Sequence, residues 1–356
     1  MLDLHEAVER ERQRPGDRLF VSDYNGGHPF VADYLGPLAD TPPYRLGDVT
    51  RYSAIDEDQA LRAKIARLHG TYDEEEVAPG RVLPGGGSSS LLGTFCTWLH
   101  LTGVRRVHYL PPVYYKFAYF FRQFGIEPVR ITDRHAHQHD FDPELPDERT
   151  VLLLTDPLWY TGRPVPTGLV KRIAEWQLAT GSLVFVDGTF QYLRWDAGRR
   201  EETAALPAGQ TLRMVCPTKY LSIHGYRCAH LLVPEQLRGT LADLHLNLHG
   251  DVTVADRLFA HRAADLMLYG EGNRRLVEYI GANYRRLLHS GALTASAPVE
   301  TGYFLFARTA APAHRLLALD QRHFELTDHP GFVRINLLNE PALNGLRELA
   351  AARPTP

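Results

Sequence analysis

Two uninterrupted apolar runs, separated by a helical pattern, constrain the fold of this chain more than any other feature. Residues 151–154 and 183–186 are all leucine, valine or phenylalanine, and the intervening segment GLVKRIAEWQLATG has apolar residues at helical spacing. Strands that are apolar on both faces are typical of parallel sheets whose two faces are covered by helices. We therefore predict an α/β fold with a mostly parallel central sheet flanked by helices.

The chain of 356 residues is long enough for two domains. After residue 250 the pattern changes to long helices followed by short strands such as GYFLFAR and GFVRINLL, which predicts a smaller α+β domain. We expect residues 1–45 to form an N-terminal arm that contributes to the small domain. Residues 46–250 are predicted to form the large ligand-binding domain, and residues 251–356 the small C-terminal domain.

An aspartate, Asp187, directly follows the second apolar run. A carboxylate at the end of a buried strand is costly unless a positive or protonated group partners it. Ligands of open α/β sheets bind beyond the carboxyl ends of the strands. We therefore expect Asp187 to face a positively charged or protonated group of a ligand.

A lysine, Lys219, follows a third apolar strand in the segment MVCPTKYLSIHGYR, and Arg227 stands eight residues after it. Lysine becomes an imine-forming nucleophile where burial or a neighbouring positive charge lowers its pKa. Lys219 is accordingly the candidate nucleophile, although a surface lysine would also fit the segment. The chain has only four lysines, and the other three occupy helical patterns that predict exposed or structural roles: Lys64, Lys116 and Lys171.

Three glycines at residues 85–87 connect a short strand to a helical pattern that begins with three serines, Ser88, Ser89 and Ser90. Free backbone N–H groups at a helix start, together with the helix dipole, bind anions. The segment therefore predicts a phosphate site, although a glycine run before a helix is a weak signal. No Lys-Ser/Thr pair follows and no GxGxxG motif is present here, which argues against a Walker loop and a dinucleotide-binding fold.

For three further positions the sequence allows two interpretations each. Tyr114 follows an expected strand end, where its ring either stacks on a flat heterocycle or joins the aromatic core. Arg334 stands between Val333 and Ile335 in a predicted strand, and it either faces solvent or clamps a carboxylate. The turn that contains Asn25 is either a simple connection or a place where the backbone approaches a ligand.

The net charge of −3 argues against general binding to nucleic acid or to anionic membranes. The three cysteines show no CxxC spacing, as a reducing compartment permits. The first residues contain no apolar signal core, and no apolar run approaches the ~18 residues of a membrane span. We expect a cytoplasmic protein without a membrane partner. The histidine-rich segment at residues 135–140 is more readily an exposed loop than a metal site.

Taken together, these residues resemble the fold type I pyridoxal-phosphate enzymes. The closest pattern is that of the class I/II aminotransferases, and among them the histidinol-phosphate aminotransferase-like branch, whose compact length this chain shares. The resemblance covers roughly residues 20 to 340 and rests on the order and spacing of the motifs. It implies the cofactor pyridoxal 5'-phosphate and an amino acid substrate.

Carried over to this sequence, the resemblance implies a role for each motif. Lys219 would form the internal aldimine and move the α-proton through a quinonoid, while Asp187 would keep the cofactor's ring nitrogen protonated. Tyr114 would stack on the ring. The cofactor's phosphate would be bound by Gly86, Gly87, Ser88, Thr218 and Arg227.

The resemblance also implies contacts with the substrate and with a second subunit. Arg334 corresponds to the arginine that binds the substrate carboxylate, and Asn25 lies where the N-terminal arm closes over the substrate. Tyr52 corresponds to the tyrosine that reaches the cofactor phosphate of the neighbouring subunit. A homodimer is therefore expected.

Two positions depart from the family pattern. The turn DPLWYTG replaces NPxNPTG, which puts Trp159 where an asparagine normally binds the cofactor's ring oxygen. Phe190 replaces a tyrosine that binds the same oxygen. Losing both groups raises the pKa of the imine unless Trp159, Tyr160 or Tyr192 substitutes for them.

The leading functional expectation is amino-group transfer from an amino acid. Because Trp159 and Phe190 replace the two residues that normally bind the cofactor's ring oxygen, a pyridoxal-phosphate-dependent lyase, cyclase, decarboxylase or oxidase is an alternative. A non-catalytic pyridoxal-phosphate-binding protein is a further alternative. It is disfavoured because Lys219 and Asp187 occur together, and mere binding does not require an electron-sink carboxylate.

Overall fold

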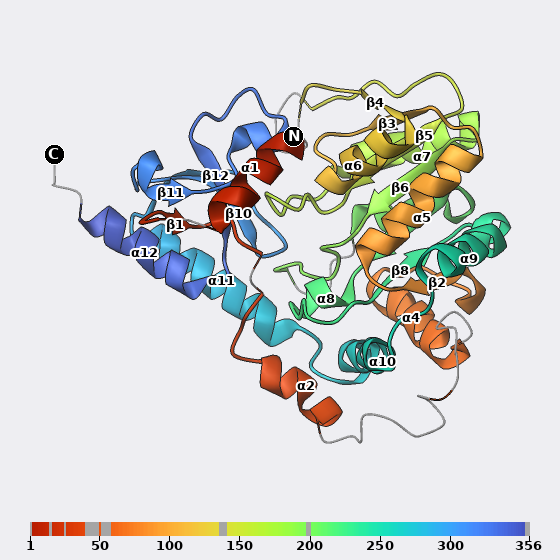
Figure 1. Cartoon of the computed structure of the whole chain (residues 1–356), viewed down its shortest axis with the longest axis horizontal. Coiled ribbons are helices and arrows are strands. Elements are labelled where there is room, and N and C mark those ends of the chain that lie inside the picture. Colours follow the sequence, from red (N-terminus) through yellow and green to blue (C-terminus); the bar gives the residue numbers. More distant parts are fainter. Residues whose placement is uncertain are drawn as a thin grey trace.

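The computed structural model of the chain describes residues 2–13, 16–24, 26–39, 50, 58–134, 141–196 and 201–352. Two lobes are visible, a large one built on a wide sheet and a smaller one that holds the C-terminal helix (Figure 1). Asn25, Tyr52 and the histidine-rich segment 135–140 lie outside the described residues, so the predictions made for them are not tested.

The large lobe contains a seven-stranded sheet. Five neighbouring strands are parallel, and β8 (Ala229–Leu232) runs antiparallel to both β7 (Thr211–Val215) and β2 (Val82–Gly85). The order across the sheet is β2 (Val82–Gly85), β8 (Ala229–Leu232), β7 (Thr211–Val215), β6 (Leu183–Asp187), β5 (Val151–Thr155), β3 (Arg106–Tyr109), β4 (Glu127–Arg130). The predicted α/β fold with a mostly parallel sheet is confirmed.

Side-chain alternation along β5 and β6 explains why both strands are apolar throughout. Leu153 and Phe185 join a core shared with Phe95 and Phe117 on one face of the sheet. Leu152, Leu154, Val184 and Val186 join a second core, shared with α7 (Thr167–Thr180), on the other face. Because successive strand residues point to opposite faces, a sheet covered on both sides leaves no position for a polar residue until the strand ends.

Helices cover the sheet and link the lobes (Figure 1). Those of the large lobe are α4 (Gln59–Tyr72), α5 (Ser88–Leu101), α6 (Tyr115–Phe124), α7 (Thr167–Thr180), α8 (Pro217–Tyr220), α9 (Glu235–His249) and α10 (Val254–Tyr269). Asp58 caps α4 by accepting a hydrogen bond from the Leu61 N–H. Short 3-10 turns are η2 (Pro79–Arg81), η3 (Glu202–Ala205), η4 (Ala208–Gln210), η5 (Ala313–Arg315) and η6 (Gln321–Phe324).

The small lobe contains a three-stranded antiparallel sheet in the order β12 (Phe332–Asn336), β10 (Phe304–Thr309), β9 (Leu293–Ser296). It is accompanied by α11 (Arg274–His289) and α12 (Glu340–Ala351). The N-terminal segment belongs to this lobe, because β1 (Leu19–Phe20) pairs in parallel with β11 (Leu316–Leu317). Helix α2 (Val31–Ala39) follows that segment.

Helix α1 (Leu2–Arg12) packs against α6 of the large lobe and β11 of the small lobe. The domain boundaries at residues 45 and 250 stay predictions. In the described ranges, no helix has the length and apolar character that a membrane crossing requires. All three cysteines are buried and free.

Candidate active site

Asp187 and Lys219 lie beyond the carboxyl ends of neighbouring parallel strands. Asp187 is the last residue of β6 and pairs in register with Met214 of β7, while Lys219 follows β7 on the short helix α8. Asp187 is 3% exposed and accepts hydrogen bonds from the backbone N–H of Thr189, at 3.1 Å, and from the Thr189 hydroxyl. Burial raises the pKa of this carboxyl.

The amine of Lys219 is partly buried, and its Nζ lies 5.8 Å from the centre of the Phe190 ring. The pKa of Lys219 is lowered to about 8, mainly by burial, with the charges of Arg334 and Arg227 adding to the effect and those of Cys216 and Asp187 opposing it. Desolvation disfavours the ammonium form. More of this amine is therefore unprotonated near neutral pH than in an ordinary lysine.

We expect the amine of Lys219 to react in cofactor-free protein with a pH midpoint near its pKa of about 8. An unperturbed lysine has a pKa of about 10.4. The measurement is the pH dependence of labelling by an amine-specific reagent, followed at each lysine by mass spectrometry. A midpoint for Lys219 equal to that of Lys171, which is exposed on α7, would contradict the lowered pKa.

The glycine–serine turn forms a cradle at the start of α5. Gly87 caps the helix with φ of +94°, and a Cβ on this residue would lie 2.8 Å from Nη2 of Arg227. The Ser90 hydroxyl closes the turn by donating to the Gly87 carbonyl at 2.8 Å. Only glycine leaves room here, because the guanidinium of Arg227 stands over the helix start. The structure thus brings together two parts of the predicted phosphate site.

The loop that carries Arg227 is held in place by α10. The Arg227 N–H donates to Oδ1 of Asp256 at 2.7 Å, and Thr253 donates its hydroxyl to the same carboxylate at 2.8 Å. Gly86 lies beside Val252 and Ser90. Thr218 is buried directly before Lys219. Each of these residues lies in a segment that borders the cradle.

Lys116, for which the sequence predicted a structural role, is electrostatically coupled to Arg227 of the cradle. It lies in the first turn of α6 and is half-buried, and its pKa is lowered by burial and by the charge of Arg227. The charges of Lys116 and Arg227, which lie on separate segments, therefore influence each other. The signal in the sequence was its position two residues after Tyr114, in a chain with few lysines.

The aromatic candidates Tyr114 and Trp159 contact each other. Tyr114 precedes α6, and its ring centre lies 6.5 Å from that of Trp159 in an edge-on arrangement. Burial raises the pKa of Tyr114, and the charge of Asp187 adds to the effect. The charge of Asp187 thus acts on the hydroxyl of Tyr114.

Arg334 is fully buried in a cage of aromatic rings. Its exposure is 0%, and its guanidinium carbon lies 4.1 Å from the ring centre of Phe304, 4.6 Å from Tyr24 and 5.2 Å from Trp159. Nη2 donates to the Ser22 carbonyl at 2.6 Å. Nε and Nη1 form no hydrogen bond with any described residue. The solvent-facing alternative for Arg334 is wrong, and two donors remain for a ligand.

A histidine that the sequence did not single out joins three distant segments beside Lys219. Nδ1 of His224 lies 2.9 Å from the carbonyl of Tyr24, and Nε2 lies 3.1 Å from the hydroxyl of Tyr303. A carbonyl only accepts, so Nδ1 carries the proton and Tyr303 donates to Nε2. Burial, and then the charge of Lys219, lowers the pKa of His224 to about 3. The imidazole is therefore neutral.

The two tyrosines named as substitutes for the missing hydroxyl lie elsewhere. The buried ring of Tyr160 stacks on Phe324 with centres 4.4 Å apart. The hydroxyl of Tyr192 donates to Oδ2 of Asp73 at 2.8 Å and lies 3.0 Å from Nδ1 of His69. Of the candidates from the sequence Trp159 remains, and the structure adds Tyr303, whose ring centre lies 5.2 Å from that of Phe190.

Three side chains have metal-like spacing: His69, Asp73 and Glu75. They already surround a cation of the chain, since Nη1 of Arg213 lies 2.8 Å from Glu75 and 3.8 Å from Asp73. The two carboxylates of this cluster thus pair with two arginines, Arg213 and also Arg81, whose Nη1 lies 3.5 Å from Glu75. It holds the turn after Asp187 in place, because Gln191 donates to Asp73 at 2.7 and 2.8 Å.

Comparison with known proteins adds family information to this geometry. The model of aminotransferase class I and II matches residues 44–345. The chain is similar to Escherichia coli YbdL, for which a methionine aminotransferase function is identified, with a TM-score of 0.78, 16% identity and coverage of 98% and 96% of the two chains.

A probable N-succinyldiaminopimelate aminotransferase from Thermus thermophilus is similar with a TM-score of 0.77, 17% identity and coverage of 99% and 98% of the two chains. N-succinyldiaminopimelate aminotransferase from Mycobacterium tuberculosis gives a TM-score of 0.75, 16% identity and coverage of 98% and 95%. At such low identity these structures show the fold. No curated protein matches the chain by sequence.

Proposed function

The chain belongs to the class I and II aminotransferases, and from this premise we propose that it transfers the amino group of an amino acid with Lys219 as its catalytic amine. The observation that carries the proposal is the partly buried Lys219, with a pKa of about 8, beside the strand-end carboxylate of Asp187. Family members are enzymes that depend on pyridoxal phosphate in general.

The residues present fit pyridoxal phosphate. The start of α5 offers backbone N–H groups under the guanidinium of Arg227, in a cradle that a Cβ on Gly87 would fill. Gly86, Ser88, Thr218 and Lys116 would add to the phosphate site. Tyr114 and Trp159 border the place for the ring, and Asp187 would hold its nitrogen protonated. When bound, the cofactor supplies an electron-accepting ring.

Side chains of the protein itself would transfer the substrate proton and bind the substrate carboxylate. Nζ of Lys219 would take the proton from the α-carbon and return it at another atom, which is general base and then general acid catalysis. Arg334 would orient the substrate through Nε and Nη1, the two donors that bind no described residue. Phe304, Tyr24 and Trp159 exclude water from that ion pair and so strengthen it.

Assembly and finer classification are parts of the same proposal. Members of the family act on amino acids and are often dimeric. We propose a cytoplasmic homodimer in which Tyr52 reaches the neighbouring site and Asn25 belongs to the arm over the substrate. The histidinol-phosphate aminotransferase-like branch remains the proposed subgroup, on the basis of compact length and motif spacing.

The test is a half-reaction screen of amino acids with the holoenzyme, in which the cofactor spectrum and the products are followed together. Aminotransfer predicts stoichiometric conversion of the cofactor to its aminated form and release of a keto acid. Phe190 and Trp159 at the oxygen side of the ring favour a second candidate, a lyase, cyclase, decarboxylase or oxidase. Product formation without aminated cofactor would establish that second candidate and exclude transfer.

Replacing Phe190 with tyrosine is expected to lower the pKa of the Lys219–cofactor linkage by about one unit, because one added hydrogen bond contributes about 0.5–1.5 kcal/mol. Phe190 is the aromatic residue beside Nζ and packs 5.2 Å from the ring of Tyr303. The measurement is a spectral pH titration of wild type and Phe190→Tyr. An unchanged titration would mean that another hydroxyl, with Tyr303 as the candidate, already fills this role.

A further inference from the structure

Lys219 and Arg334, the two groups that the proposed reaction requires, belong to different lobes. Lys219 follows β7 of the large lobe, and Arg334 lies on β12 of the small lobe. A substrate held by Arg334 would react only with its α-carbon at the amine, and a misplacement of about 1 Å costs such a reaction about 10²-fold in rate. The protein therefore needs contacts that fix the distance between the two groups.

A row of three aromatic rings connects the amine to the guanidinium. The centre of the Phe190 ring lies 5.8 Å from Nζ of Lys219 and 5.2 Å from the ring centre of Tyr303. The ring centre of Phe304 lies 4.8 Å from that of Tyr303 and 4.1 Å from the guanidinium carbon of Arg334. Tyr303 is fully buried in the middle of this row. Its hydroxyl is the one polar group of the three rings.

His224 ties this row to the lysine loop, which we define as residues 219–224. Its Nε2 accepts a hydrogen bond from the hydroxyl of Tyr303 at 3.1 Å. The charge of Lys219 acts on the same imidazole, where it adds to burial in lowering the pKa of His224 to about 3. The imidazole thus stays neutral at the pH of an enzyme assay, and its Nε2 remains an acceptor for Tyr303.

The second nitrogen of His224 holds the N-terminal arm, of which residues 21–24 and 26–28 are described. Nδ1 donates to the carbonyl of Tyr24 at 2.9 Å. The backbone of the arm also packs directly on the imidazole, because a Cβ on Gly26 would lie 2.8 Å from Cε1 of His224. The arm is thus docked on the lysine loop by a hydrogen bond and by close contact.

The arm in turn forms part of the carboxylate site. The ring centre of Tyr24 lies 4.6 Å from the guanidinium carbon of Arg334, and Nη2 of Arg334 donates to the carbonyl of Ser22 at 2.6 Å. On the other side, Tyr303 directly precedes Phe304, which forms a second wall around the guanidinium. The two nitrogens of His224 therefore bind both parts of the chain that enclose Arg334.

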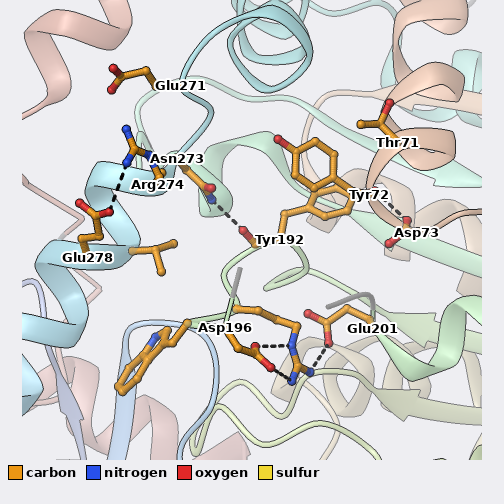
Figure 2. Close-up of a pocket in the computed structure, with 13 residues that line it drawn as sticks. Thr71, Tyr72, Asp73, Tyr192, Asp196, Glu201, Glu271, Asn273, Arg274 and Glu278 are labelled. Carbon is orange, nitrogen blue, oxygen red and sulfur yellow. Dashed lines mark hydrogen bonds and ion pairs between the residues drawn. The ribbon is translucent and has the colours of Figure 1, made fainter. Parts of the chain in front are cut away.

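The lysine loop has other anchors that do not involve His224. Asn273 donates to the carbonyl of Tyr220 at 2.8 Å and to that of Tyr192 at 2.7 Å, and Figure 2 shows the second of these bonds beside a cavity of about 540 Å³. Nε2 of His28 donates to the carbonyl of Leu221 at 2.8 Å. Loss of the two imidazole hydrogen bonds is thus expected to shift the walls of the carboxylate site rather than to unfold the loop.

We propose that His224 is a positioning residue, which holds the arm and the small lobe against the lysine loop and so fixes the distance between Lys219 and Arg334. A neutral imidazole suits this role because it offers one donor and one acceptor on a rigid ring. The inference rests on the proposed function, since it requires that Arg334 binds the substrate carboxylate.

The test compares His224→Phe with wild type in the half-reaction of the holoenzyme, with the best amino acid and with the amine that lacks its α-carboxylate. The variant is expected to lower kcat/KM for the amino acid about 10-fold, because the carboxylate site is no longer aligned with the amine, and to leave the amine within about 2-fold. His224→Gln keeps one donor and one acceptor, and it is expected to recover most of the loss.

The matched control is His108→Phe. His108 is a buried histidine of β3 whose Nδ1 lies 3.0 Å from the hydroxyl of Thr150, so this variant also removes an imidazole hydrogen bond from the core. It is expected to leave both rates unchanged. If His224→Phe does not fold, Gly26→Ala tests the same docking, because its methyl group would collide with the imidazole. The same selective loss with the amino acid is expected.

A double-mutant cycle separates positioning from a general loss of structure. In Arg334→Leu no carboxylate contact remains to be aligned, so adding His224→Phe is expected to cause no further loss with the amino acid. The proposal is overturned if the two losses add, or if His224→Phe or Gly26→Ala affects the amine as much as the amino acid.

The single variants also distinguish a failure of this inference from a failure of the proposed function. If Arg334→Leu discriminates between the two substrates and His224→Phe acts like wild type, the positioning role alone is refuted. If Arg334→Leu treats both substrates alike, the carboxylate assignment fails, and the role of His224 fails with it.

Discussion

Lys219→Ala is expected to lose the visible absorbance of the lysine-bound cofactor and to reduce turnover by at least about 10³-fold, since loss of a general base alone costs about 10²- to 10⁴-fold. The same amine is proposed to bind the cofactor covalently and to move the substrate proton, and no other described lysine lies at the end of β6 or β7. The measurements are the absorption spectrum and the half-reaction rate with the best amino acid.

The matched control is Lys171→Ala, which removes an exposed lysine of α7 and is expected to leave spectrum and rate unchanged. The melting temperature of cofactor-free Lys219→Ala is expected to be at least that of wild type, because the variant removes an amine whose pKa is lowered by burial. A variant that is still coloured and active would refute the assignment of Lys219.

Arg334→Leu is expected to lower kcat/KM for an amino acid by about 10- to 100-fold, which corresponds to about 1.5–3 kcal/mol for a charged hydrogen-bonded contact. The loss comes from the substrate carboxylate, which would bind Nε and Nη1 within the aromatic cage. The discriminating substrate is the amine that lacks the α-carboxylate. Its kcat/KM is expected to be equal in wild type and Arg334→Leu.

Arg308→Leu is the control for the loss of an arginine from the same sheet. Arg308 is exposed on β10, and its guanidinium carbon lies 5.4 Å from the ring centre of Phe332, so it has a similar aromatic contact without burial. This variant is expected to act like wild type on both substrates. If Arg334→Leu lowers the rate for the amine as much as for the amino acid, Arg334 has a structural role and the carboxylate proposal fails.

The fold was predictable because its strongest signals are local. The apolar runs at β5 and β6 required burial on both faces, and strand ends were the places where a charged residue had to mark a site. Asp187 is the last residue of the buried strand β6, and Lys219 follows the buried strand β7 closely, so both could be picked out from the sequence. Strand β9, which has the weakly apolar sequence LTAS, gave no such signal, and its pairing with β10 decides its conformation.

Parts of the site were unpredictable because they depend on contacts across the chain. Arg334 read equally well as exposed or buried, since its surroundings are supplied by Tyr24 and Trp159, which are far away in sequence. His224 had no motif of its own, and its tautomer follows from the carbonyl of Tyr24. Tyr192 stood close to Phe190 in sequence, yet its hydroxyl is directed to Asp73.

The pairing of β1 with β11 sets an order for the assembly of the protein during synthesis. Leu19 pairs with Leu316, and the carbonyl of Ser22 binds Arg334, so the arm that carries Tyr24 has no sheet partner until nearly the whole chain has left the ribosome. Closing such a long loop also slows folding. Strand β7 ends about a hundred residues before Leu316, Arg227 of the cradle lies about ninety residues before it, and Asp256, which holds the Arg227 loop, about sixty. The proposed phosphate cradle is thus synthesised well before the sheet partner of the arm that carries Tyr24.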